Sequence, residues 1–284
     1  MSTEILGFPT DAPEGSAPGR AGAPVLVGCS HGTDNPDGQA AIRAILDDVR
    51  AVRPDLDVRE AFVDVQQPEV ADVVTRAVAP CASGEGRGGA AVVVPLLLST
   101  GFHVNVDITE AVSADHEGRG PDHGPAAAAG ALGPDPRLAQ VLADRLAEAG
   151  VRPHDAVVLA AAGSSRAGAA RDVEAVAEHL RAHHDGPVTV GFGAMATPSV
   201  RDAVAAAREV LATAARGEEG AAARVVVAAY LLAPGFFHDR LRETGADLVT
   251  APLAPDPRLT AIVLDRYAEG VAALADRSPA GSPR

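Results

Sequence analysis

The chain has 284 residues, of which 47% are hydrophobic, so it can form one large domain or two modest ones. Its 24 basic and 38 acidic residues give a formal charge of -14, which repels phosphate backbones and anionic bilayers and excludes nucleic acid and membrane surfaces as expected partners. The 2 cysteines form no CxxC pair, so we expect a reducing, cytoplasmic environment rather than a disulfide scaffold.

The two ends of the chain predict tails. Residues 1–23 are rich in Gly, Pro and Ala and carry neither the basic nor the apolar region of a signal peptide, so we expect a disordered tail there. A second, short tail is expected over residues 276–284. No apolar stretch reaches the roughly 18 residues that a membrane helix needs, and the sequence therefore predicts a soluble protein.

Between the tails, short apolar runs alternate with segments of helical period, the pattern typical of βαβ units. The runs are apolar throughout, which predicts strands buried on both faces, as in parallel sheets. The predicted strands span residues 25–27, 92–98, 157–161 and 225–232. The predicted helices span residues 39–52, 68–78, 138–149, 171–182, 199–214 and 259–274. We therefore expect an α/β fold in which helices flank parallel sheets.

An internal repeat divides the chain. The segment LGPDPRLAQVLADRLAEAGV from Leu132 returns as LAPDPRLTAIVLDRYAEGV from Leu253, with Pro-Asp-Pro-Arg-Leu intact in both copies. Upstream, VLVGCSHGT aligns with AVVLAAAGS, AFVDVQQPEV with GFGAMATPSV, and VVVPLLLSTGFH with VVVAAYLLAPGFF once a one-residue gap is allowed. We expect two similar lobes, 24–151 and 152–275, each closed by its own copy of the final helix.

The repeat is an internal control, because a scaffold needs the same residues in both copies whereas a functional site can be kept in one. Turn-forming residues persist, as where Pro68 matches Pro198. Three chemically active residues do not persist. His31, Asp64 and His103 stand opposite Ala162, Ala194 and Phe237. A shift of the gap by one residue would instead pair His103 with His238.

Two imidazoles and a carboxylate are a donor set that binds divalent metal ions. Each of the three residues follows a predicted parallel strand, at the edge where open α/β sheets place their ligands. Three donors leave coordination positions open, which favours transient metal binding or proton transfer over a structural site closed by four ligands. Taken singly, each residue is also typical of a loop or a helix cap. The loss of all three from the second lobe favours the functional interpretation.

With these residues identified, the chain resembles the sirohydrochlorin chelatase family, the CbiX-like members of the class II tetrapyrrole chelatases, over about residues 24–275. The family's Gly-His-Gly-Ser turn, Phe-Leu-Glu segment and Pro-Leu-Phe-Leu strand with a following Gly-Gly-His and Asp are similar to GCSHGT, AFVDVQQP and VPLLLSTGFHVNVDI. His31 and His103 match the family's metal-binding histidines. Asp64 stands where Glu is usual, and Asp107 matches the downstream acid. Further departures are Ser30 for Gly, Thr33 for Ser and Phe102 for Gly.

The resemblance implies a lyase-class chelatase that inserts Fe²⁺, for sirohaem synthesis, or Co²⁺, for cobalamin synthesis, into sirohydrochlorin with release of two protons. It implies that His31, His103 and Asp64 bind the metal and carry the catalysis in a cleft between the lobes. The metal is then a substrate, and no permanent cofactor is expected. Sirohydrochlorin carries eight carboxylates, so amide donors and a cation are also needed. The residues expected to bind it are Ser30, Gly32, Thr33, Ser99, Thr100, Gly101, Asp107 and Arg166.

Alternatives stay open from the sequence. One is a non-catalytic metal- or tetrapyrrole-binding protein such as a metallochaperone, and another is a precorrin-modifying enzyme that needs no metal. A phosphate-binding enzyme using Ser164 and Ser165 is disfavoured, because neither GxGxxG nor P-loop spacing is present. The insertion at 113–130, which holds His116 and His123, is a further place where metal could gather. Because its lobes are already fused, we expect a monomer or a weak homodimer.

Overall fold

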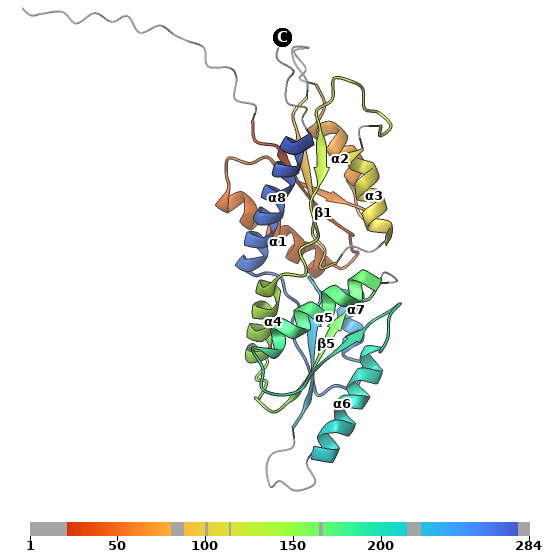
Figure 1. Cartoon of the computed structure of the whole chain (residues 1–284), viewed down its shortest axis with the longest axis vertical. Helices are drawn as coiled ribbons and strands as arrows, with labels where there is room; N and C mark the ends of the chain where they lie inside the picture. Colours follow the sequence, from red (N-terminus) through yellow and green to blue (C-terminus); the bar gives the residue numbers. More distant parts are fainter. Residues whose placement is uncertain are drawn as a thin grey trace, which may run out of the picture.

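Two α/β lobes make up the protein in a computed structural model that describes residues 22–80, 88–99, 102–113, 115–164, 167–214 and 223–277 (Figure 1). Each lobe contains a four-stranded parallel sheet, with strand order β2-β1-β3-β4 in the first and β6-β5-β7-β8 in the second. The predicted fold class is therefore confirmed. Of the predicted tails, residues 1–21 and 278–284 lie outside the described residues.

The elements follow one another in the same order in both halves. The first half holds β1 (Val25–Ser30), α1 (Pro36–Val52), β2 (Val58–Phe62), α2 (Val70–Ala77), β3 (Ala91–Pro95), α3 (Phe102–Val112), β4 (Ala126–Ala128) and α4 (Pro136–Glu148). The second half holds β5 (Ala156–Ala161), α5 (Ala167–Arg181), β6 (Val188–Phe192), α6 (Val200–Ala214), β7 (Val225–Tyr230), α7 (Phe236–Leu241), β8 (Leu248–Val249) and α8 (Pro257–Arg277). The four predicted strands are thus the central ones, β1, β3, β5 and β7.

The central strands are buried because each face of a sheet is covered. In the first lobe, Leu26 and Val92 pack on the side of α1 and α8, whereas Val27 and Val93 pack on the side of α2 and α3, as the period of two in a strand requires. The cluster that contains Leu26 continues into the second lobe, so the lobes share one hydrophobic core. None of the described helices is long and apolar enough to cross a bilayer.

The helix that ends each repeat lies on the sheet of the other lobe. α4 packs against α5 and β7 of the second lobe, whereas α8 packs against α1, β3 and β4 of the first (Figure 1). Gly270 of α8 permits the close approach, because a Cβ there would collide with the Val92 side chain. Each lobe is therefore closed by the helix of the other repeat, which differs from the expectation that each copy closes its own half. The reason is that β4 and β8 run parallel to their neighbours, so the chain leaves each of them at the carboxyl end of its sheet, the end that faces the other lobe.

The repeated Pro-Asp-Pro-Arg motif joins the two exchanged helices. Asp135 caps α4 by accepting a 2.9 Å hydrogen bond from the Arg137 amide, and its carboxylate pairs with the Arg137 guanidinium at 2.7 Å. Arg137 also reaches Asp265 on α8 at 2.7 Å. In the second copy, Arg258 reaches Asp144 on α4 at 2.5 Å. Two symmetric ion pairs therefore hold α4 to α8, which explains why both copies keep the motif.

Candidate functional site

Three neighbouring strands of the first sheet position the predicted metal donors. β1 lies between β2 and β3 in the sheet. His31 directly follows β1, Asp64 lies two residues beyond β2, and His103 is the second residue of α3, the helix that follows β3. The structure therefore places the backbones of His31 and Asp64 at adjacent carboxyl ends of parallel strands, and that of His103 in the first turn of the helix that follows the third strand. The side chain of His103 lies outside the described part of the chain.

A backbone contact brings His31 and Asp64 together. The Asp64 amide donates a 3.0 Å hydrogen bond to the His31 carbonyl oxygen, and Val63 makes the same bond, also 3.0 Å, to Ser30. Both the His31 and the Asp64 side chains are exposed. The Asp64 carboxylate accepts a 2.7 Å hydrogen bond from the amide of Val65, whose φ of 58° is strained for a β-branched residue. The two candidate donors thus share one small, strained and exposed turn region.

Glycine follows His31 because the backbone at position 64 leaves no room for a side chain. Gly32 has a φ of 93°, and a Cβ there would collide with the Asp64 carbonyl oxygen. Gly163 repeats the arrangement in the second lobe with a φ of 95° against the Ala194 carbonyl. These glycines are therefore part of the scaffold that lets the two strand ends approach each other.

The turn after His31 is held by side chains of its neighbours. Gln66 accepts a 2.9 Å hydrogen bond from the Thr33 amide, and Gln39 donates one of 2.8 Å to the Thr33 carbonyl. Asn35 caps α1 by accepting a 2.9 Å hydrogen bond from the amide of Gly38. Of the residues expected to bind sirohydrochlorin, Thr33 is partly exposed here, whereas Ser30 is buried at 5% exposure.

Asp107 is the predicted acid on α3, one turn after His103. Its side chain is exposed, and its charge adds to the effect of burial, the larger cause, in raising the pKa of Cys29 to about 12. The next residue of α3, Ile108, packs in the same hydrophobic cluster as Cys29 of β1. Ser99 follows β3 and is partly exposed. Thr100, Gly101 and Arg166 lie outside the described residues.

The second lobe repeats the backbone of this site without its donors. The Ala194 amide donates a 2.9 Å hydrogen bond to the Ala162 carbonyl, the counterpart of the bond between Asp64 and His31. The pairing of the central strands shows which residues of the two lobes are equivalent. Val25 pairs with Ala91 in the first lobe, and its counterpart Ala156 pairs with Val225 in the second, so Ala91 corresponds to Val225. With this register the two copies align without the one-residue gap expected from sequence. Counting on from these strands pairs His103 with Phe237, and α3 and α7 begin at equivalent residues.

The other histidines singled out by the sequence have structural contacts. His238, expected on the rim of the site, is instead 6% exposed, and its Nε2 lies 3.0 Å from the Thr250 carbonyl oxygen. In the insertion, His123 accepts a 3.0 Å hydrogen bond from the Gly120 amide, and Arg119 donates to the Ala111 carbonyl at the end of α3. The described residues contain no group of three or more His, Cys, Asp and Glu side chains placed to hold a metal ion.

The carboxyl ends of the two sheets face each other. A Cβ at Gly133 would collide with the carbonyl oxygen of Leu98, just beyond β3, and would lie 2.6 Å from the hydroxyl of Tyr230 at the end of β7. A Cβ at Gly38, in the first turn of α1, would lie 2.5 Å from the Pro234 carbonyl oxygen. The turn after β1 therefore lies against the turn that precedes α7.

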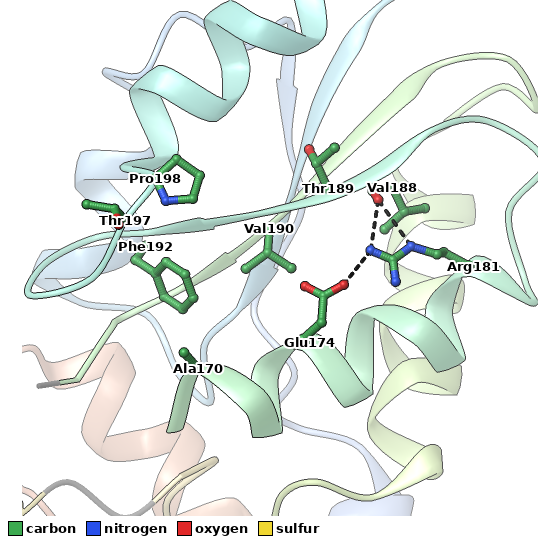
Figure 2. Close-up of a pocket in the computed structure, with 9 residues that line it drawn as sticks. All are labelled: Ala170, Glu174, Arg181, Val188, Thr189, Val190, Phe192, Thr197 and Pro198. Atoms are coloured by element: carbon green, nitrogen blue, oxygen red, sulfur yellow. Dashed lines mark hydrogen bonds and ion pairs between the residues drawn. The ribbon is translucent and has the colours of Figure 1, made fainter. Parts of the chain in front are cut away.

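Two cavities of the second lobe lie away from these strand ends. One of about 420 Å³ lies between α5 and the edge strand β6, and one of about 360 Å³ lies between β6 and α6. In the first cavity, Arg181 pairs with Glu174 at 2.7 Å and donates a hydrogen bond to the Val188 carbonyl oxygen (Figure 2). The two charged side chains that line this cavity therefore neutralise each other. No residue predicted for the functional site lines either cavity.

The fold and the strand ends together define a duplicated two-lobe α/β protein that carries candidate metal donors in one lobe only. A family model for CbiX matches residues 25–149 and 156–270, one match for each repeat. The chain belongs to the CbiX family, which confirms the resemblance seen in its sequence.

Solved structures share the whole fold. SirB from Bacillus subtilis with Fe3+ is 21% identical with a TM-score of 0.69, covering 89% of this chain and 97% of that one. SirB from Bacillus subtilis subspecies spizizenii in complex with cobalt is 18% identical with a TM-score of 0.67 and the same coverage, 89% and 97%. CbiX, described as the terminal enzyme for biosynthesis of siroheme in denitrifying bacteria, is 18% identical with a TM-score of 0.55, covering 88% and 98%. No curated protein matches the chain in sequence.

Proposed function

We propose that the chain is a sirohydrochlorin chelatase, an enzyme that inserts Fe²⁺ or Co²⁺ into sirohydrochlorin and releases two protons. Membership of the CbiX family supports the reaction class. The structures described as SirB with Fe3+ and with cobalt support iron and cobalt as the metals to test first. Imidazole and carboxylate ligands accept both ions, so the donor set alone does not select between them.

One observation carries the proposal: the two lobes have the same backbone at their strand ends and different chemistry on it. The hydrogen bond between positions 64 and 31 in the first lobe has its counterpart between positions 194 and 162 in the second. Only the first lobe has an imidazole and a carboxylate at these positions. A side chain kept for folding would be needed in both lobes, so the donors of the first lobe are best explained by chemistry.

The proposed mechanism assigns two roles to the histidines. As neutral imidazoles, His31 and His103 bind a divalent ion without closing its coordination sphere, so that the ion can pass to the macrocycle. An imidazole that has released the ion can accept a pyrrole proton near neutral pH. The Asp64 carboxylate attracts the incoming cation and stabilises the imidazolium that forms. The exposed positions of His31 and Asp64 agree with access by a large substrate.

An anaerobic insertion assay tests the proposal. Sirohydrochlorin is mixed with Fe²⁺ or Co²⁺ and protein, and the visible spectrum is followed for the wild type, His31→Ala and His154→Ala. His154 is an exposed histidine two residues before β5. It lies at the amino end of that strand, away from the carboxyl ends that carry the candidate site, and serves as the matched control. We expect His31→Ala to slow insertion by on the order of 100-fold, as for loss of an acid–base group, and His154→Ala to leave the rate unchanged.

The same assay separates the other functions. Equal rates for His31→Ala and the wild type would remove His31 from the mechanism. A long-lived stoichiometric metal complex with no spectral change of the tetrapyrrole would indicate a metallochaperone. A spectral change that persists in the presence of a metal chelator would indicate a metal-independent precorrin-modifying enzyme.

A further inference from the structure

Helix α7 presents two aromatic side chains to solvent. Phe236 is 67% exposed and Phe237 is 40% exposed, whereas the other phenylalanines with described side chains, Phe62 and Phe192, are 2% and 6% exposed. The two rings of α7 meet edge to face, with centroids 5.6 Å apart and an interplanar angle of 78°. The Arg240 guanidinium lies over the Phe236 ring, 5.4 Å from its centroid. Among the phenylalanines whose side chains are described, the exposed ones are therefore these two neighbours on α7.

The opposite face of α7 anchors the helix that carries these rings. His238 and Leu241 are 6% and 4% exposed, and the imidazole of His238 is held against the Thr250 carbonyl at 3.0 Å. Because they are three residues apart, these two buried residues share one face of the helix. Phe236 and Arg240, four residues apart, share the outward face. The outward face is therefore preorganised, which lowers the entropy cost of binding a ligand there.

This face borders the candidate donors of the first lobe. α7 lies at the end of the second lobe that faces the first (Figure 1). Thr33, two residues after His31, has its Oγ1 3.7 Å from the point where a Cβ of Gly235 would lie, and Gly235 directly precedes α7. Phe237 packs on Gly193, where a Cβ would lie 3.1 Å from its Cδ1 atom. Thus Phe237 covers the carboxyl end of β6, which is the counterpart in the second lobe of the β2 end that precedes Asp64.

Arg240 gives this face a cation that can pair with an anionic ligand, beside the exposed carboxylates of Asp239 and Glu243. The chain carries a formal charge of -14, and within its described part Arg240 is exposed and makes no ion pair with an acidic side chain. We propose that Phe236, Phe237 and Arg240 form a substrate-binding surface, on which the rings contact the apolar face of a tetrapyrrole and Arg240 pairs with one of its peripheral carboxylates. This inference rests on the proposed function, because that function supplies the tetrapyrrole.

The test measures binding separately from metal insertion. Metal-free sirohydrochlorin is titrated with the full-length protein in the presence of a chelator, and its visible absorbance reports the dissociation constant. Phe236→Ala, Phe237→Ala and Arg240→Gln are each expected to weaken binding by roughly threefold to tenfold. Arg242→Gln removes the same charge from an exposed position about 160° around the helix from Arg240, and we expect it to bind like the wild type. Thermal unfolding confirms that each variant is folded.

Metal insertion by the wild type, measured beside these dissociation constants, separates the two proposals. If the wild type inserts metal and the α7 variants bind as tightly as the wild type, the inference is wrong and the chelatase function stands. If the wild type binds the tetrapyrrole without inserting metal and the α7 variants bind more weakly, the surface is confirmed and the chelatase function is wrong. If the wild type does not bind the tetrapyrrole, both are wrong.

Discussion

The amide of Asp64 donates a 3.0 Å hydrogen bond to the carbonyl oxygen of His31, so the two candidate donors are joined through their backbones. Gly32 makes this possible, because any Cβ at that position would collide with the Asp64 carbonyl. The second lobe makes the same bond between Ala194 and Ala162 at 2.9 Å. The contact is thus a property of the duplicated scaffold, and the side chains placed on it differ between the lobes.

Asp64→Ala removes the hydrogen bond from the Val65 amide to the carboxylate. The second lobe forms the same backbone contact with Ala194, followed by Met195 at a φ of 58°, so the turn is expected to form without the carboxylate. Asp64→Ala is expected to slow metal insertion by about 10- to 100-fold, the usual cost of losing a carboxylate that supports metal-binding histidines. Asp64→Glu keeps the charge on a side chain one methylene longer and is expected to retain most of the activity. Initial rates from visible spectra measure both variants. Insertion by Asp64→Ala at the wild-type rate would exclude a role for the carboxylate.

Arg258 is expected to stabilise the exchange of helices between the lobes. Its guanidinium contacts Asp256 at 2.7 Å and Asp144 of α4 at 2.5 Å. Arg258→Ala is therefore expected to lower the free energy of unfolding by about 1.5 to 3 kcal/mol, the range for hydrogen bonds to charged groups. Urea unfolding provides the measurement. Arg59→Ala, which breaks a pair with the half-exposed Asp57, is the control and should cost less. Equal losses would show that Arg258 does not join the lobes.

Asp155 is expected to make the fold sensitive to acid. It is 1% exposed and accepts hydrogen bonds from both the backbone and the side chain of Arg152 and of Arg224. Burial raises the pKa of this carboxyl, but the hydrogen bonds from Arg224 and Arg152 outweigh burial and hold the pKa well below its usual value. Since the pKa is lower in the folded state, the stabilisation is complete above about pH 4 and is lost as the pH falls further.

The variant Asp155→Asn tests whether the Asp155 carboxylate stabilises the fold at neutral pH and loses this effect in acid. At pH 7 the variant is expected to lose about 1.5 to 3 kcal/mol of unfolding free energy, because two partly exposed guanidinium groups lose the charged acceptor of their hydrogen bonds. The difference from the wild type should shrink as the pH is lowered from 5 to about 2, over which the Asp155 contribution is lost. The measurement is the free energy of unfolding of both proteins across this pH range. A difference between variant and wild type that stays constant with pH would contradict a lowered pKa of Asp155 in the folded state.

Tyr230 has a buried hydroxyl that makes no hydrogen bond within the described part of the chain. The residue is 2% exposed, and its counterpart in the first lobe is the apolar Leu96. Because an unpaired buried hydroxyl costs about 1 to 3 kcal/mol, Tyr230→Phe is expected to raise the free energy of unfolding by that amount. The matched control is Tyr267→Phe, which removes a 2.6 Å hydrogen bond to the Pro24 carbonyl and should lower stability. A loss in both variants would show that the Tyr230 hydroxyl is paired.

The central strands and the duplication could be predicted because both follow from the order of residues along short stretches of the chain. Apolar runs such as 92–98 report burial on both faces, which only a covered parallel sheet provides. The outer strands carry a weaker pattern: β2 reads VREAF, with two adjacent charged residues inside it, and β4 and β8 are only 3 and 2 residues long. The repeat also predicted the candidate donors, because the absence of His31, Asp64 and His103 from the second copy is visible without coordinates.

The α/β class, the two repeats and the residues that differ between them can thus be read from the chain without its fold. Three further features are visible only in the folded chain: α4 and α8 exchange lobes, the backbone of Asp64 meets that of His31, and His238 is buried against Thr250. The physical reason is that periodicity records how much of a segment is buried, whereas these features depend on which distant segment buries it. That choice is made by contacts between whole elements, such as the ion pair between Arg258 and Asp144, which no local pattern encodes.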